Sequence, residues 1–158
     1  MAPTPNHKSP SPLCEGDALV NEVDAYNALC AYTLQLRDPA FLHQYVVDAW
    51  TVRNATANTK PIALAFAMFG LYLAVEKGIS GRQVQRFHMH MAKRHRSWPS
   101  LPLPQGSPAV TVLDVMLAPS GSKRDALILA LAAATWKCCT AARPAVVELA
   151  HKECGIAP

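Results

Sequence analysis

Two histidines and one cysteine fall on predicted helix faces that are otherwise apolar. At about 100° per residue, His43 lies on the apolar stripe of one predicted helix and His88 on that of a later helix. Cys30 lies on the inward stripe of a third helix, nearer the N-terminus. Three groups able to bind a metal, or to act as nucleophile and base, are therefore expected to point inward from three different helices.

These residue types suit metal binding or nucleophilic catalysis. They are also common as structural residues of a helical core. Imidazole and thiolate ligands on facing helices form metal sites in bundles, and a cysteine beside a histidine is the minimal activated nucleophile. A histidine on an apolar face is, however, commonly a core residue bonded to a carbonyl group, and a buried cysteine commonly acts as a small hydrophobe. The sequence favours the structural role for each residue taken alone, and it disfavours a metal shared by His43 and His88.

An acidic residue and two aromatic residues complete the candidate site. Asp48 lies on the flank of the His43 stripe, where it could orient a histidine, act as a general acid or base, or accept from Lys60 or a backbone amide. Tyr26 and Trp50 could line a pocket or could be aromatic filling of the core. The candidate catalytic residues are thus His43, Asp48 and His88, and the candidate ligand-binding residues are Trp50, Cys30 and Tyr26.

The familiar motifs of catalysis and cofactor binding are missing from the sequence. It has no glycine-rich phosphate loop, no GxSxG, no HExxH, no zinc-finger spacing and no EF-hand loop. No nucleotide or flavin cofactor is indicated, and the sequence does not decide whether the protein is an enzyme.

Hydrophobic periodicity and capping residues predict an all-α fold, a compact bundle of four principal helices with short extra helices. The second helix is expected to open at Asp38-Pro39, with Pro at its first position, and the third, apolar nearly all round, to be central and to end at Gly78. Capping boxes are expected at Ser80–Gln83 and Thr111–Asp114, and a cap at Ser122–Asp125. We expect helices over residues 17–36, 38–53, 61–77, 80–97, 111–117 and 122–142, and a further short helix or a kink from Pro144. The proline-rich residues 99–108 are expected to form a linker or an extended strap.

Composition indicates one globular domain. The chain has 158 residues, of which 51% are hydrophobic and 16% charged, enough for one core and too few for two ordinary domains. Residues 1–12, which include four prolines, are expected to be a flexible tail, and residues 13–158 a single domain. The sequence shows no secretory signal and no stretch suited to crossing a membrane, so we expect a cytoplasmic protein whose five cysteines are free thiols.

The net charge of +4 is mild, and the basic residues are mostly scattered. The densest basic run, residues 93–96, falls at a predicted helix end, where cations also suit the helix dipole. This interpretation is favoured over a phosphate-binding patch, and no helix-turn-helix is convincing, so binding to nucleic acid is not expected.

Three groups of short motifs, in this order and spacing, resemble a bacterial family of small helical proteins of unknown function. The resemblance covers roughly residues 25–150 and rests on Asp38-Pro39-Ala40 with His43 and Val47-Asp48-Ala49, on Met91-Ala92 before Trp98-Pro99-Ser100-Leu101-Pro102, and on Thr111-Val112-Leu113-Asp114-Val115. It implies the helical fold and draws attention to His43 and Asp48, but it implies no activity.

The sequence also departs from that family's pattern. Only Cys14 remains of an N-terminal cysteine pair, and Gln35 stands where a glutamate is expected. The C-terminal helix keeps Trp136 but lacks a second tryptophan and a histidine pair. A family site that used those residues would be altered in this chain.

Two functions from different classes follow from these observations. The first is a small-molecule pocket inside the bundle, lined by His43, Asp48, Trp50 and His88, in a binding protein or a biosynthetic or tailoring enzyme. The second is a non-catalytic interaction or regulatory module that acts as a homodimer, which the high apolar fraction modestly favours.

Overall fold

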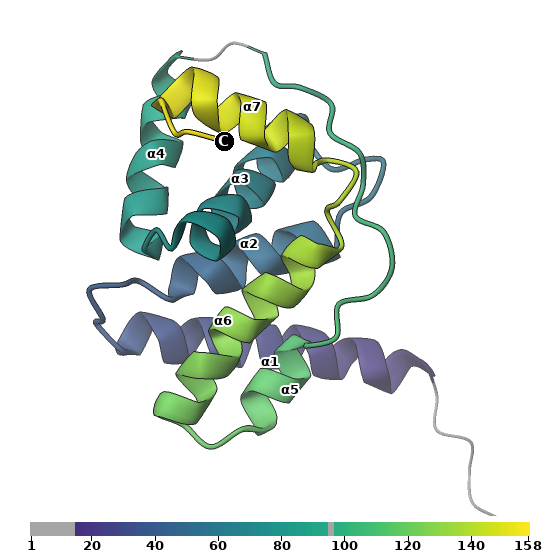
Figure 1. Ribbon diagram of the computed structural model, residues 1–158. Helices are drawn as coiled ribbons and strands as arrows, with labels where there is room; N and C mark the ends of the chain where they lie inside the picture. The colour runs from purple at the N-terminus through teal and green to yellow at the C-terminus, as the bar shows by residue number, and fades with distance from the viewer. Residues whose placement is uncertain (1–14, 95–96) are drawn as a thin grey trace, which may run out of the picture.

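The computed structural model describes residues 15–94 and 97–158, and every regular element in this part of the chain is a helix (Figure 1). The all-α prediction is therefore confirmed. The helices are α1 (Glu15–Gln35), α2 (His43–Arg53), α3 (Pro61–Lys77), α4 (Gly81–Arg94), α5 (Val112–Leu117), α6 (Ser122–Lys137) and α7 (Arg143–Cys154).

Helix α3 lies at the centre of the bundle, as its nearly uniform apolar surface predicts. It packs against α2, α4, α6 and α7, and its middle turns from Leu64 to Leu73 are almost wholly buried (Figure 1). Pro61 occupies the first turn, and Gly78 ends the helix with a left-handed φ of 63°. The predicted start at Pro61 and the predicted end at Gly78 are both confirmed, because each depends on the local backbone alone.

Helix α1 crosses one side of this core, where it packs against α2 and α5 (Figure 1). Among residues 21–35 of this helix, the buried residues are Ala25, Leu29 and Thr33, and Val23 is 46% exposed. The hydroxyl group of Tyr32 donates to Asp125 at 2.7 Å and so ties α1 to the start of α6.

The predicted start of the second helix is wrong. Helix α2 begins at His43, and residues 38–42 form a tight turn. The main-chain N–H of Leu42 donates to the Asp38 carboxylate at 3.1 Å, and Phe41 has a positive φ of 56°, which helical backbone does not allow. Asp38 thus caps a turn rather than the helix itself.

One helix end near the C-terminus also differs from its prediction, whereas the further short helix expected from Pro144 is confirmed. Helix α6 ends at Lys137, and turns follow before α7 begins at Arg143, with Pro144 in its first turn. The predicted cap at Ser122–Asp125 is absent: the N-cap is Gly121, and the Asp125 carboxylate accepts from Tyr32 instead.

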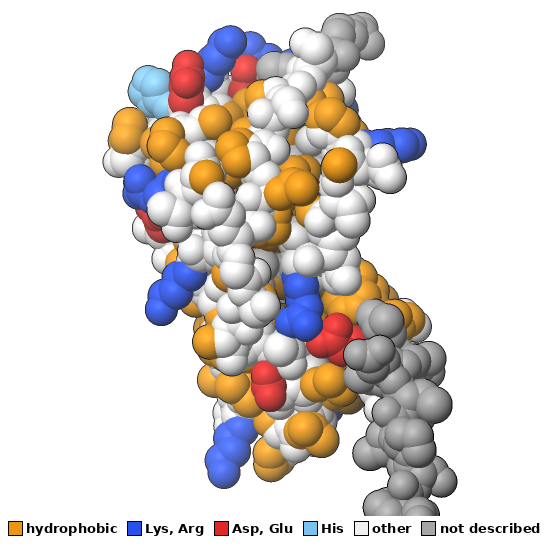
Figure 2. Space-filling view, turned by 90° about the vertical axis from the view of Figure 1, so that its right-hand side faces the viewer, with side chains coloured by type: hydrophobic (Ala, Val, Ile, Leu, Met, Phe, Trp, Pro, Cys, Tyr) orange, Lys and Arg blue, Asp and Glu red, His pale blue; other side chains and the backbone are white. Residues whose placement is uncertain are grey.

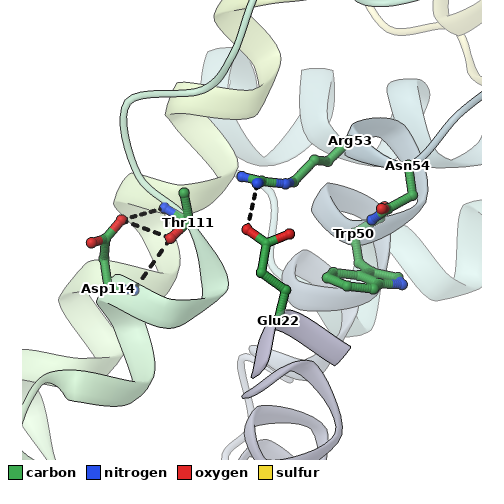
Figure 3. Close-up of polar contacts among 6 residues, drawn as sticks. All are labelled: Glu22, Trp50, Arg53, Asn54, Thr111 and Asp114. Carbon is green, nitrogen blue, oxygen red and sulfur yellow. Dashed lines mark hydrogen bonds and ion pairs between the residues drawn. The ribbon is translucent and has the colours of Figure 1, made fainter. Parts of the chain in front are cut away.

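The capping box at Thr111–Asp114 is confirmed (Figure 3). The Asp114 carboxylate accepts from the Thr111 main-chain N–H at 2.7 Å, and the Thr111 hydroxyl accepts from the Asp114 N–H at 3.3 Å. At Ser80–Gln83 one half of the box is present, because the Gln83 N–H donates to the Ser80 hydroxyl at 3.3 Å.

The proline-rich segment is an extended strap along one side of the bundle (Figure 1). The main-chain N–H of Gln105 donates to the carbonyl group of Cys138 at 2.8 Å, and Leu101 is buried against the core. Hydrophobic side chains are scattered over this side of the molecule, with Lys, Arg, Asp and Glu side chains at separate places among them (Figure 2).

Several predictions fall beyond the part of the chain that the structure covers. The expected tail at residues 1–12, the cysteine at Cys14, and the last two residues of the basic run, 95 and 96, lie outside the described residues. Cys30, Cys138, Cys139 and Cys154 are free. No helix among the described residues is both long enough and apolar enough to span a bilayer.

Candidate functional site

His43 begins α2 and faces α1, where its ring is held by Thr33. The Thr33 hydroxyl is hydrogen-bonded to Nδ1 of His43 at 2.9 Å, and it also lies 2.9 Å from the carbonyl oxygen of Leu29 and 3.1 Å from that of Cys30. If the hydroxyl donates to a main-chain carbonyl group, Nδ1–H of His43 donates to Thr33 and Nε2 is the acceptor nitrogen of the ring. Partial burial lowers the pKa of His43, which favours the neutral imidazole.

His88 is a core histidine on α4. Its Nε2–H donates to the carbonyl group of Phe66 at 2.9 Å, and its ring stacks on that of Phe66 with centroids 4.6 Å apart. Burial lowers its pKa to about 4, with the Phe66 hydrogen bond acting in the opposite direction. His88 is therefore neutral at pH 7 and fills space against α3.

The two histidines have separate surroundings. His43 contacts Thr33 and Phe41, whereas His88 contacts Phe66 and Phe69 on α3. Within residues 15–94 and 97–158, no group of three or more His, Cys, Asp or Glu side chains is arranged to hold a metal ion.

Tyr26, Cys30 and Trp50 do come together, at the contact between α1 and α2. The rings of Tyr26 and Trp50 are stacked, with centroids 4.3 Å apart and planes 9° from parallel. The Cys30 thiol and the Tyr26 hydroxyl are hydrogen-bonded to each other. Burial is the largest effect on each group, and it raises the pKa of both the thiol and the hydroxyl. The raised pKa keeps the Cys30 thiol protonated, so the contact among these three residues is a packing contact with little nucleophilic character. The salt bridge between Glu22 and Arg53 lies beside Trp50 (Figure 3).

Asp48 is buried on the other side of α2, where it faces α3 and α4. It is 3% exposed, and its Oδ1 accepts from the side-chain amide of Gln44 at 2.9 Å. Its Oδ2 has no hydrogen-bond partner and lies so close to Gly70 that a Cβ there would stand 2.0 Å from it. Burial raises the pKa of Asp48 well above its ordinary value, and the Gln44 hydrogen bond offsets this only in part. Asp48 orients neither histidine, since Thr33 and Phe66 occupy that role.

A basic cavity, which sequence reasoning missed, lies beside His43. It measures about 280 Å³ and is lined by Thr33, Leu34, Arg37, Asp38, Phe41 and Arg82. Thr33 and Phe41 are also the two residues that His43 contacts. The cavity therefore joins the end of α1, the turn at residues 38–42 and the start of α4.

Two arginines give the cavity its charge. The Arg82 guanidinium lies over the Phe41 ring, 4.3 Å from its centroid. Neither Arg37 nor Arg82 forms an ion pair with a carboxylate of the described residues. Asp38 also lines the cavity, but its carboxylate accepts from the main-chain N–H of Leu42. The cavity lining thus has two arginines and only one carboxylate, and that carboxylate is already hydrogen-bonded to the backbone. This excess of positive charge makes the cavity suitable for an anion.

The backbone around the cavity is strained. Arg37 and Phe41 have positive φ angles of 50° and 56°, and these are the only residues other than glycine with positive φ in the described chain. Such conformations cost about 1–3 kcal/mol each and are concentrated at functional sites. The turn is held in place by α4, whose Arg82 N–H donates to the carbonyl group of Ala40 at 3.2 Å.

Gly81 permits this approach between α4 and the turn. A Cβ at this position would lie 2.1 Å from the main-chain oxygen of Phe41. In the sequence, Gly81 is part of an expected capping box, and Arg37 lies between two expected helices. The signal that unites them is a tertiary contact, which helix periodicity does not reveal.

Comparison with known proteins identifies the group to which this chain belongs. No curated protein and no solved structure matches it. Residues 22–140, which contain all six residues that line the basic cavity, match a family of unknown function. The chain is a member of this family, DUF5946.

Proposed function

We propose that the protein binds a small anionic molecule, one that carries a carboxylate or phosphate group, in the basic cavity at Arg37 and Arg82. The observation that carries the proposal is that two arginines, neither in an ion pair with a carboxylate of the described residues, line one cavity beside a strained turn. Guanidinium groups bind carboxylates and phosphates through paired, charge-assisted hydrogen bonds.

Thr33 lines the cavity and is hydrogen-bonded to His43 at 2.9 Å, so His43 lies behind a residue of the cavity wall. The binding form of the proposal needs only the arginines. An enzymatic form would use the His43 imidazole as the proton acceptor for the bound molecule.

The homodimeric module is the second candidate. Leu117 and Leu129 are 83% and 52% exposed, on the neighbouring helices α5 and α6. Exposed apolar side chains that occur singly are common on monomers, so we rank this candidate below the anion site. Gel filtration coupled to light scattering tests it, and a monomer at high protein concentration would reject it.

Thermal unfolding in the presence of phosphate, pyrophosphate or succinate tests the anion site. We expect at least one of these anions to raise the Tm by about 3–6 °C when its concentration is about ten times the Kd, relative to sodium chloride of equal ionic strength. Arg37→Ala should remove the shift, since the variant keeps the turn but loses one guanidinium group.

Arg86→Ala is the matched control, because Arg86 is an exposed arginine on α4 that does not line this cavity. It should retain the full shift. An equal shift in wild type and Arg37→Ala, or the absence of a shift with all three anions, would reject the proposed site.

A further inference from the structure

The outer face of α4 carries a stripe of basic side chains around one exposed methionine. On a helical wheel Arg82, Arg86, Met89, His90 and Lys93 fall within an arc of about 100°, and all five are exposed. Helix α4 contains no acidic residue along its whole length. We call Arg86, Met89, His90 and Lys93 the α4 face.

Helix stability does not account for all of these charges. Lys93 and Arg94 stand in the last turn, where cations interact favourably with the helix dipole. Arg82 stands in the first turn, where a cation is unfavourable and an acidic residue would be expected, and Arg86 is too far from either end to gain.

The cations of the α4 face are also unpaired within the described chain. Among residues 21–94 and 97–158, no carboxylate forms an ion pair with Arg86 or Lys93, and Arg94 lies 3.3 Å from the His90 ring nitrogen. Like charges along one face repel one another, so an acidic partner that neutralised them would be favoured.

Met89 indicates what kind of acidic partner fits. Its side chain is 59% exposed between the cations. A cavity of about 340 Å³ lies alongside, lined by Gln83, Arg86, Phe87, His90, Glu153 and Cys154. A flexible thioether flanked by charge is typical of surfaces that bind amphipathic peptides. A single-stranded nucleic acid would instead use exposed aromatic rings for base stacking, and the α4 face has none.

We propose that the α4 face docks an acidic, amphipathic segment of a partner protein, with carboxylates opposite Arg86 and Lys93 and an apolar side chain against Met89. This interaction does not depend on the proposed anion site, because it uses none of the residues that bind at the Arg37 cavity.

Fluorescence anisotropy with a labelled helical peptide of glutamate and leucine, spaced so that leucines share one face, tests the proposal at low ionic strength. We expect the double variant Arg86→Glu/Lys93→Glu to weaken binding about tenfold or more, and Met89→Ser to weaken it several-fold. A peptide whose leucines are replaced by serine should bind the wild type several-fold more weakly than the original peptide does. The same replacement should change peptide binding by the Met89→Ser variant little.

Two controls make the result specific. Lys60→Glu/Lys123→Glu reverses two exposed charges away from α4 and should leave binding within about twofold, and Arg37→Ala should do the same. Failure of the anion site would remove the phosphate response but keep peptide binding, so the two proposals are separable.

The proposal is overturned if the peptide does not bind, or if both charge-reversal pairs weaken binding equally. It is also overturned if an oligothymidylate or phosphatidylserine vesicles bind more tightly than the peptide and lose binding in Arg86→Glu/Lys93→Glu, because the α4 face would then serve nucleic acid or a membrane.

Discussion

Replacing Asp48 by asparagine is expected to stabilise the folded protein at pH 7 by about 1–3 kcal/mol. The carboxyl group is buried, with Gln44 as its hydrogen-bond partner and Oδ2 without one. Folding at pH 7 must either protonate this group or bury its charge, and both cost free energy. Asparagine has the same shape against Gly70, keeps an oxygen that accepts from Gln44, and carries no charge.

The pH dependence identifies the cause of this gain. Because burial raises the folded-state pKa of Asp48, its contribution to stability is fully present below the unfolded value of 3.8 and is lost as pH rises towards the folded value. Wild type and Asp48→Asn should therefore differ little near pH 3.8 and increasingly above it. Urea unfolding across this range measures the difference. Asp24→Asn, an exposed carboxylate on α1, is the control and should change stability little at any pH.

A stabilisation that is the same at every pH would assign the gain to packing rather than to the carboxyl charge. A loss of stability at pH 7 would show that the ionised carboxylate has a partner that compensates its burial.

Replacing His88 by phenylalanine is expected to remove a destabilisation at acid pH. The folded-state pKa of His88 is lowered to about 4 from an ordinary value of 6.5, so its contribution to stability is present above pH 6.5 and is lost as pH falls towards 4. The contribution of His88 that is lost between pH 7 and pH 4 amounts to about 3 kcal/mol. Phenylalanine keeps the aromatic packing against Phe66, whose carbonyl group lies within α3.

Urea unfolding between pH 4 and 7 checks this prediction, and His151→Gln, an exposed histidine near the end of α7, is the matched control. His88→Phe should lose less stability than the wild type or the control as pH falls. Parallel losses in all three proteins would mean that His88 does not carry the acid sensitivity.

Asp48 and His88 oppose each other from pH 4 up to the lower of 6.5 and the folded-state pKa of Asp48. Over this window Asp48 makes the protein less stable as pH rises, and His88 makes it more stable, so the wild-type profile should be flatter than that of either single variant. The double variant should again be flat, and at a higher stability than the wild type at neutral pH.

Elements with local signals could be predicted from the sequence. Pro61 and Gly78 define α3, the Thr111–Asp114 box starts α5, and four prolines exclude a helix from residues 99–108. In each case neighbouring residues determine the backbone conformation. The start of α2 could not be predicted in this way, because Asp38-Pro39 suits both a helix N-terminus and a tight turn. The choice between them depends on the contact with α4.

The candidate site was harder to predict for a related reason. Periodicity shows which side chains face inward, but it does not show which helix they meet. His43 meets α1 while His88 meets α3, so a common inward direction does not bring them together. Tyr26, Cys30 and Trp50 do meet, but as a packing contact. The basic cavity depends on Arg37 and Arg82, which belong to segments far apart in the chain and carry no motif.

An NMR titration of ¹⁵N-labelled protein with phosphate and pyrophosphate tests whether Arg37 and Arg82 form an anion site. We expect saturable shifts concentrated in the amide signals of residues 33–43 and 81–83, and we expect Arg37→Ala to lose them. Shifts that are weak and unsaturable, that are centred on another surface, or that persist in Arg37→Ala would contradict the proposed anion site.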